Sequence, residues 1–434
     1  DHDEKVQMVW ETLRGRVPKR SHSLLQSEFH KIPGSPFVYW VSDKIRGLFG
    51  KLKPLEKYAN VVQGLATADN DRFLRFWWEV KAEDISVEYK RDRKKWVPYA
   101  KGGPYNKWYG NLWWVVNWEN DGREIKNYVV ERYPYINGKY EWVVKNESYY
   151  FKEGLTYSFV SSFGFSCRYS PKNSIFDVGG SSMFPISNKP EDFLGIISSK
   201  LESFFMRVLN PTVNYQVGDL KNLPMVDPGN FPTKKLSLKM DSSFSASPFP
   251  HTFELGSDKL TLSTLAQDCI ALKKSLYTFH VMERDFQRDP LDWALQQAAE
   301  QAQPPSVKLA LEQFFLHKAQ LEAQLLINEA LNDELVFKLY GLLPEERTLT
   351  DLLNHPELRG SSADDGIAAV YEVLDSEGVP VGAYPPRELT EDENQKLRKL
   401  YLEYRHHRGS GNSEVNLGMD FGIVEEIAGA LQLN

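Results

Sequence analysis

Polar and apolar residues follow a distinctive order between Val61 and Val80, in the stretch VVQGLATADNDRFLRFWWEV. A β-branched pair precedes Gly64, a polar segment follows at 67–71, and aromatic residues then dominate. This order predicts a strand, a tight turn, and a short strand or helix that buries its rings. Asp69 and Asn70 favour the turn because their short side chains hydrogen-bond to nearby backbone. We expect a rigid turn on an aromatic core, a usual place for binding groups.

The residues before position 225 predict strands flanked by helices. Residues 37–49 have the apolar spacing of an amphipathic helix. Short aromatic and β-branched runs separated by turns predict strands over 82–152 and 153–184. An apolar stripe at helical spacing begins at Pro190 and ends before Asn210-Pro211, which predicts a core helix. Residues 213–217 then predict one more strand.

The pattern changes beyond residue 225. Residues 226–258 are rich in Pro, Ser and Gly, which predicts a linker. Residues 259–342 have helical periodicity, and the acidic region 343–434 predicts one clear helix at 391–405. We therefore expect an α+β protein, a β-rich domain followed by a helical spacer or bundle. The predicted division is a connecting segment at 1–54, a β-rich domain at 55–225, a linker at 226–258, a helical domain at 259–342 and an acidic region at 343–434.

Length and cysteine usage narrow the class of protein. The 434 residues exceed one ordinary core, and the two cysteines lie far apart. This excludes a disulfide scaffold and a Cys-rich zinc site, and it favours a reducing compartment. The sequence has no signal peptide and no apolar run that could span a bilayer, so we expect a cytoplasmic protein with no membrane contact. Because the chain begins at Asp1 within a helical pattern, we expect a fragment of a longer protein.

The charge is distributed unevenly. The net charge is −7, yet residues 341–434 hold 8 Lys and Arg against 18 Asp and Glu, a net −10, which leaves +3 on the first 340 residues. The main basic cluster lies at 89–111, where seven Lys and Arg and several aromatic residues surround one acid, Asp92. Such residues neutralise DNA phosphates and position bases, but a solvated hairpin with its rings in a core has the same composition. Composition alone favours the solvated hairpin over a DNA contact.

Two smaller features allow alternative interpretations. Arg168 has a guanidinium fork that matches a guanine edge, but it could equally form an ion pair with Asp177. The pair Gly102-Gly103 would let the backbone approach a ligand closely, whereas Gly179-Gly180 is more typical of a turn or bulge. His406-His407 is more typical of a surface than of a metal site, because no third ligand is evident.

No catalytic constellation is visible in the sequence. A Gly-rich nucleotide loop after a strand, a P-loop lysine motif, a Ser-His-Asp set, HExxH and CxxC are all missing. This favours a binding or recognition role.

Several segments, in order and spacing, resemble the C-terminal half of the PglX family, the adenine-specific DNA methyltransferases of bacterial BREX phage-defence systems. They are also similar to Type IIG restriction–modification enzymes. The resemblance covers roughly residues 28 to 342. It rests on HKIPGSPFVYW at 30–40, QGLATADNDRFLRFWWEV at 63–80, KKWVPYAKGGPYNKWYGN at 94–111, VNWENDGREIKNY at 116–128, YFKEGLTYS at 150–158, FSCRYSPKNSIFDVGGSSMF at 165–184, LGIISSKLESFFMRVLNPTVNYQVGDLKNLP at 194–224 and NEALNDELVFKLYGL at 328–342.

The resemblance implies that residues 55–225 are a DNA target-recognition domain. In that family an N-terminal methyltransferase domain holds S-adenosylmethionine and an Asn-Pro-Pro-Tyr motif, which binds the flipped adenine. This sequence has neither motif, since Asn210-Pro211 is followed by Thr212-Val213, so we expect no cofactor and no activity in this chain alone. The implied partners are double-stranded DNA and the N-terminal methyltransferase domain. The implied DNA contacts are Thr67, Asp69, Asn70, Arg72, Lys94, Lys95, Lys101, Gly102, Gly103, Asn106, Lys107, Arg168, Tyr169, Ser170 and Lys172.

Two other functions fit the sequence. The helical region and acidic tail could make the chain a protein-interaction module that docks other BREX proteins, or a DNA-mimicking phage inhibitor could occupy its basic face. The chain could also be the specificity part of a Type IIG enzyme that cuts DNA, although no nuclease motif is visible.

Overall fold

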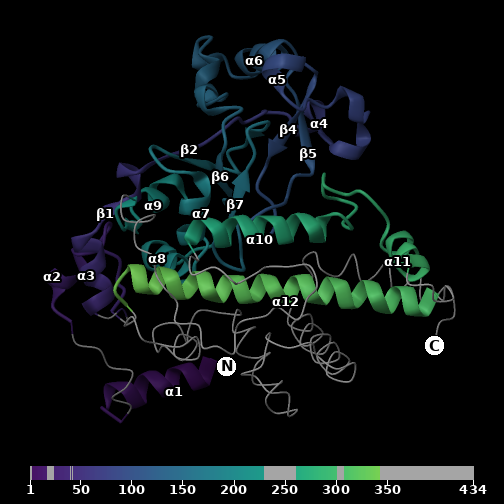
Figure 1. Cartoon of the computed structure of the whole chain (residues 1–434). Helices are drawn as coiled ribbons and strands as arrows, with labels where there is room; N and C mark the ends of the chain where they lie inside the picture. The colour runs from purple at the N-terminus through teal and green to yellow at the C-terminus, as the bar shows by residue number, and fades with distance from the viewer. Residues whose placement is uncertain are drawn as a thin grey trace.

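The computed structural model describes residues 2–16, 24–39, 41, 43–228, 261–300 and 307–342 (Figure 1). The predicted α+β class is confirmed, because helices and two four-stranded sheets occur together. Most of the predicted linker lies outside the described residues. So do the acidic region, its predicted helix at 391–405, and His406-His407.

The N-terminal part is helical and is tied to the end of the β-rich region by a small sheet. Its helices are α1 (His2–Leu13), α2 (Gln26–Phe29) and α3 (Asp43–Lys51). The helix predicted over 37–49 begins only at Asp43, whose carboxylate lies in the positively polarised first turn. Strand β1 (Lys53–Pro54) pairs antiparallel with β10 (Pro224–Met225).

The first four-stranded sheet is antiparallel, and helices cover it. Its strands, in spatial order, are β2 (Ala59–Val62), β9 (Ser182–Pro185), β6 (Gly154–Tyr157) and β7 (Cys167–Ser170). The predicted core helix divides at Ser198-Ser199 into α7 (Pro190–Ile197) and α8 (Lys200–Leu209), and its apolar stripe is largely buried. The strand predicted at 213–217 is not formed. Only an isolated bridge joins Asn214 to Val160, and α9 (Val217–Lys221) follows.

The second sheet carries the other core. Its order is β3 (Leu74–Phe76), β5 (Trp114–Asn117), β4 (Trp96–Ala100) and β8 (Ile175–Phe176), with β8 parallel to β4. Three helices accompany it, namely α4 (Asn70–Phe73), α5 (Tyr89–Asp92) and α6 (Glu119–Arg132). Short 3-10 helices span Leu55–Lys57, Trp77–Glu79, Ala82–Asp84, Pro134–Ile136, Tyr140–Trp142 and Glu147–Tyr149.

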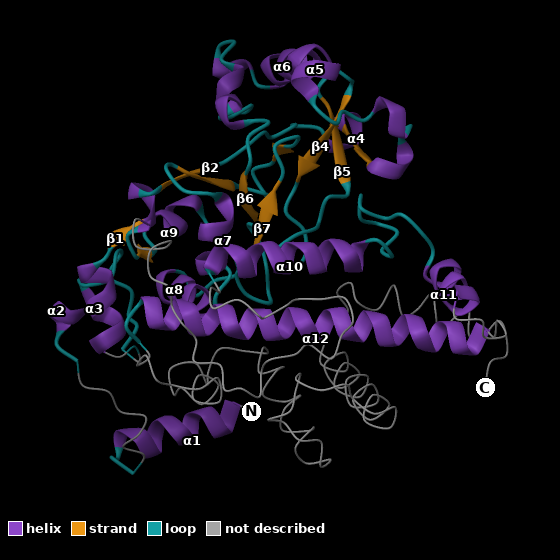
Figure 2. Ribbon diagram, viewed as in Figure 1, coloured by secondary structure: helices purple, strands orange, loops and turns teal. Residues whose placement is uncertain are grey.

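Residues 119–149 correct the prediction of continuous β structure. They form α6 and three 3-10 helices (Figure 2). Ile125 and Val129 are fully buried and lie four residues apart, which is helical spacing. The strand pattern of the flanking segments therefore does not extend through this stretch.

The C-terminal helices pack beneath the sheets. They are α10 (Leu262–Tyr277), α11 (Pro290–Glu300) and α12 (Val307–Leu339). Helix α12 runs below α10 and roughly parallel to it in the view of Figure 1. One hydrophobic cluster joins residues from the N-terminal part, the first sheet and these helices, including Val38, Leu155, Leu265 and Val336. Apolar burial thus joins the β-rich region to the helical region. No helix among the described residues is long and apolar enough to cross a membrane.

Candidate nucleic-acid interface

The predicted turn at 67–71 leads into α4 and is held by its own side chains. Thr67 is buried, and its hydroxyl donates to Asn70 Oδ1 at 2.7 Å. Asp69 caps α4 by accepting the Arg72 backbone N–H at 3.0 Å, as short acidic side chains do at helix starts. Ala68 adopts a left-handed conformation with φ of 60°. The turn is thus rigid, and Asn70 remains exposed.

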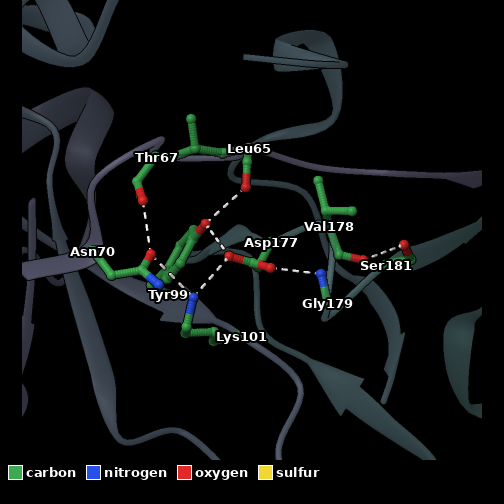
Figure 3. A network of polar contacts seen from close by, with 9 residues as sticks. All are labelled: Leu65, Thr67, Asn70, Tyr99, Lys101, Asp177, Val178, Gly179 and Ser181. Atoms are coloured by element: carbon green, nitrogen blue, oxygen red, sulfur yellow. Dashed lines mark hydrogen bonds and ion pairs between the residues drawn. The ribbon is translucent and has the colours of Figure 1, made fainter. Parts of the chain in front are cut away.

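A polar network fixes this turn to two strands (Figure 3). Lys101 Nζ lies 3.2 Å from Asn70 Oδ1 and 3.3 Å from Asp177 Oδ2. The buried Tyr99 hydroxyl donates to the same Asp177 oxygen at 2.6 Å and lies 2.8 Å from the Leu65 carbonyl oxygen. Burial, and secondarily the negative charge of Asp177, raises the pKa of Tyr99 well above its usual value. The phenol therefore stays neutral and acts as a donor.

Helix α6 supports the turn from its other side. Arg72 forms an ion pair with Glu124 at 2.8 Å, and its guanidinium lies 4.9 Å from the centre of the Tyr128 ring. The Tyr128 hydroxyl donates to Asp69 Oδ2 at 3.2 Å. Arg72 is half exposed, so one face of its guanidinium remains accessible. The predicted residues Thr67, Asp69, Asn70, Arg72 and Lys101 are therefore brought together.

The basic cluster at 89–111 divides into an outer and an inner part. Lys95 is exposed and lies 3.9 Å from Glu119, while Lys94 is half-buried and donates to the Ile85 carbonyl at 3.3 Å. Beyond Gly103 the chain turns inward. Asn106 and Lys107 are each only 8% exposed, and Trp108 is 1% exposed. This placement does not support DNA contacts by Asn106 and Lys107, because neither side chain reaches the surface.

The inner part, residues 104–113, is anchored to the helical region. Glu283 lies just beyond α10, and its carboxylate accepts the backbone N–H groups of Asn111 at 2.9 Å and Leu112 at 3.1 Å. The same carboxylate accepts the indole N–H of Trp113 at 2.8 Å. Asn106 donates to the Tyr277 hydroxyl at 2.6 Å, and Trp108 donates to Glu329. Trp108 and Trp113 therefore dock this segment onto the helical region.

Glu283, Tyr277 and Glu329 were not predicted from the sequence. They lie about 170 to 220 residues from their partners, and no local motif marks them. The only related signal was the segment 328–342, which the family resemblance included without a role.

The predicted glycine pair Gly102-Gly103 approaches the protein's own backbone. A side-chain carbon on Gly102, whose φ is +87°, would lie 2.5 Å from the Gly179 carbonyl oxygen. A side-chain carbon on Gly180 would lie 2.3 Å from the Ala100 carbonyl oxygen. The two glycine pairs therefore pack against each other.

Arg168 takes neither predicted role. It is 1% exposed, and it donates to the Asn106 carbonyl at 3.2 Å and to the Ser158 hydroxyl at 3.1 Å. Asp177 pairs with Lys101 instead. Desolvation lowers the pKa of Arg168. A buried guanidinium with internal partners cannot reach a base edge in this conformation, so the structure corrects that prediction to a structural role.

The neighbours of Arg168 also differ in exposure. Tyr169 is half-buried and donates to Glu153, and Ser170 is buried 3.2 Å from the Ser174 hydroxyl. Lys172 is exposed on the turn after β7. Of this predicted group, Lys172 alone is exposed. Among the described residues, no cluster of His, Cys, Asp and Glu could hold a metal ion.

Comparison with known proteins supports the resemblance inferred from the motifs. No protein-family model matches the chain. The chain is 36% identical over 206 residues to the adenine-specific methyltransferase PglX of Lacticaseibacillus casei, and 37% identical over 206 residues to the adenine-specific methyltransferase BrxX of Escherichia coli. Each match covers 46% of this chain but only 17% and 16% of the relatives, about a sixth of their length. The predicted similarity to PglX-type adenine-specific methyltransferases is thus confirmed for nearly half of the chain.

Proposed function

We propose that this chain recognises a duplex DNA sequence for an adenine-specific DNA methyltransferase that acts in BREX-type phage defence. The observation that carries the proposal is the similarity to two adenine-specific methyltransferases in a chain that contains no Asn-Pro-Pro-Tyr motif. A part of such an enzyme without the adenine-binding motif has DNA positioning as its natural task. S-adenosylmethionine would be held by the methyltransferase domain.

The rigid turn at 67–72 and nearby exposed lysines support this proposal. Asn70 and the half-exposed Arg72 offer amide and guanidinium groups, which suit base edges in the major groove. Their positions are fixed by Thr67, Asp69 and Lys101, so little ordering entropy would be lost on binding. Exposed lysines such as Lys95 and Lys172 would contact phosphates and set the register. The bound duplex would then present one adenine to the methyltransferase domain.

The test is duplex DNA binding by the 434-residue chain, titrated against salt. Wild type is compared with Lys95→Ala/Lys172→Ala, because both side chains are exposed. If each lysine contacts one phosphate, the variant binds more weakly, and the slope of log affinity against log salt becomes shallower by about 2. Lys44→Ala/Lys51→Ala is the matched control, since these exposed lysines lie on α3 in the N-terminal part.

The outcomes separate the candidate functions. Equal slopes for wild type and Lys95→Ala/Lys172→Ala would remove these lysines from the interface. No duplex binding at any salt concentration, alone or with the methyltransferase domain added, would overturn the proposal and favour a protein-interaction module.

A further inference from the structure

The segment from Arg132 to Trp142 forms an exposed tip that the sequence did not single out. It follows α6, at the opposite end of the molecule from α12 (Figure 1). Two large rings face solvent, since Tyr135 is 69% exposed and Trp142 is 58% exposed. Burying rings of this size would be favourable, so two exposed rings on one short segment are consistent with a binding surface.

The tip is held in one conformation by successive turns. The Asn137 N–H donates to the Pro134 carbonyl at 3.1 Å, and the Trp142 N–H donates to the Lys139 carbonyl at 3.2 Å. Asn137 and Gly138 are left-handed, with φ of 50° and 78°. Ile136 and Val144 anchor the segment, because both are buried in the core of the second sheet. The rings are therefore presented by an ordered backbone, which lowers the entropy cost of binding.

The base of the tip joins the candidate interface. Val144 forms an antiparallel bridge with Leu65, and the Ala66 N–H donates to the Val143 carbonyl at 3.1 Å. Trp142 directly precedes Val143, which pairs with Ala66, and Ala66 directly precedes Thr67 of the turn. Just past the tip, Lys145 donates to Gln63 at 2.8 Å. Because the two segments are paired at this point, a ligand bound at the turn at 67–72 would also lie close to Trp142.

The charges on the tip favour an anionic ligand. Arg132 and Lys139 are both exposed, and no ion pair is recorded for either among the described residues. Lys139 Nζ lies 5.8 Å from the centre of the Trp142 ring. The acids Glu131 and Glu141 interrupt this patch, so its attraction is local rather than a broad basic field. Exposed rings beside unpaired cations match a polymer that alternates bases with phosphates.

We propose that this tip is a second DNA contact, in which Trp142 and Tyr135 stack on unstacked bases while Arg132 and Lys139 contact adjoining phosphates. The inference rests on the proposed function, because DNA must first occupy the turn at 67–72. The tip would hold bases that leave the duplex stack next to the recognised site, a role that needs rings more than hydrogen-bonding groups.

The experiment uses the 434-residue chain and a short duplex that carries one unpaired 2-aminopurine. Wild type should quench the fluorescence of this base. Trp142→Ala should abolish the quenching and weaken binding roughly 5- to 100-fold without changing the salt slope, since stacking releases no counterions. Lys139→Ala should make the slope shallower by about 1. Trp142→Phe should restore most of the affinity, because it retains a ring.

The control is Trp78→Ala. Trp78 is 43% exposed and stacks on Phe76, but its neighbours Glu79, Glu83 and Asp84 are acidic. If wild type binds the probe while Trp142→Ala and Tyr135→Ala leave affinity and fluorescence unchanged, the tip proposal is overturned and the proposed function stands. Equal losses for Trp78→Ala and Trp142→Ala also overturn it. If wild type binds no DNA, alone or with the methyltransferase domain added, both proposals fail.

Discussion

The turn at 67–72 and the loop at 104–113 differ in the exposure of their side chains, although both contain residues that were predicted to contact DNA. The turn leaves Asn70 exposed and Arg72 half exposed. The loop buries Asn106, Lys107 and Trp108 and is bound to helices that follow it by more than 170 residues. One segment thus keeps polar side chains exposed, and the other joins the β-rich region to the helices.

The difference shows that the position of the aromatic residues decides whether the basic residues of a segment face solvent or the interior. Around the turn, the rings belong to neighbouring elements and lie beneath the polar groups, as Tyr99 and Tyr128 do. In the loop, Trp108 and Tyr109 are themselves buried, and they carry Lys107 inward with them. A basic segment with interleaved rings can therefore be an internal docking segment as readily as a DNA clamp.

The largest effect is expected at Glu283, which anchors the loop. Glu283→Ala leaves two backbone N–H groups and one indole N–H without their acceptor, so the free energy of unfolding should fall by about 3–5 kcal/mol. Urea denaturation measures this. The exposed Glu131→Ala is the control and should change stability by less than about 0.5 kcal/mol. Similar values for the two variants would contradict the anchoring role.

A pH effect of similar origin is expected at Asp333, which is buried on α12 and accepts the Lys200 N–H at 2.8 Å. Desolvation, partly offset by Lys200 and Lys107, raises the pKa of Asp333 from 3.8 to about 6. A raised folded-state pKa stabilises the fold fully below the unfolded pKa, near 4, and this contribution is lost as pH rises through about 6.

The measurement is the free energy of unfolding of wild type and Asp333→Asn between pH 4 and pH 7. Between pH 4 and pH 7, wild type should lose about 2 kcal/mol of unfolding free energy relative to Asp333→Asn. The exposed Asp71→Asn should run parallel to wild type. A parallel curve for Asp333→Asn would argue against a perturbed carboxyl at this interface.

Two lysines of the basic cluster provide a direct contrast. Lys107→Met removes a buried charge near Asp333, so it should destabilise the fold by roughly 2 kcal/mol and leave the salt slope of DNA binding unchanged. Lys95→Ala should leave stability within about 0.5 kcal/mol and make the slope shallower by about 1. The reverse result would place the DNA contact on the loop.

A smaller effect on stability than at Glu283, Asp333 or Lys107 is expected at Asn70. Asn70→Ala removes an acceptor for Thr67 and Lys101, which should cost about 1 kcal/mol of unfolding free energy and weaken duplex binding. Asn70→Asp keeps the acceptor oxygen and should retain most of the stability. Unchanged DNA binding by Asn70→Ala would remove the turn from the interface.

Local patterns predicted several elements well. The polar turn predicted at 67–71 leads into the short helix α4, and Pro190 opens α7 as predicted. The apolar stripe at 193–208 is core, as its spacing predicted. These features depend on residues within about one helical turn of each other, which a sequence displays directly. The helical segment at 119–149 was missed, because its aromatic residues suggested strands and outweighed the spacing of Ile125 and Val129.

The sequence by itself determined the α+β class, the rigid polar turn and the resemblance to adenine-specific methyltransferases. Tertiary structure alone decided which cations face solvent. It buried Arg168 and Lys107, paired Asp177 with Lys101, and left the rings of Tyr135 and Trp142 exposed. The physical reason is that exposure depends on which distant elements pack over a side chain, and partners such as Glu283 and Glu329 lie far away along the chain.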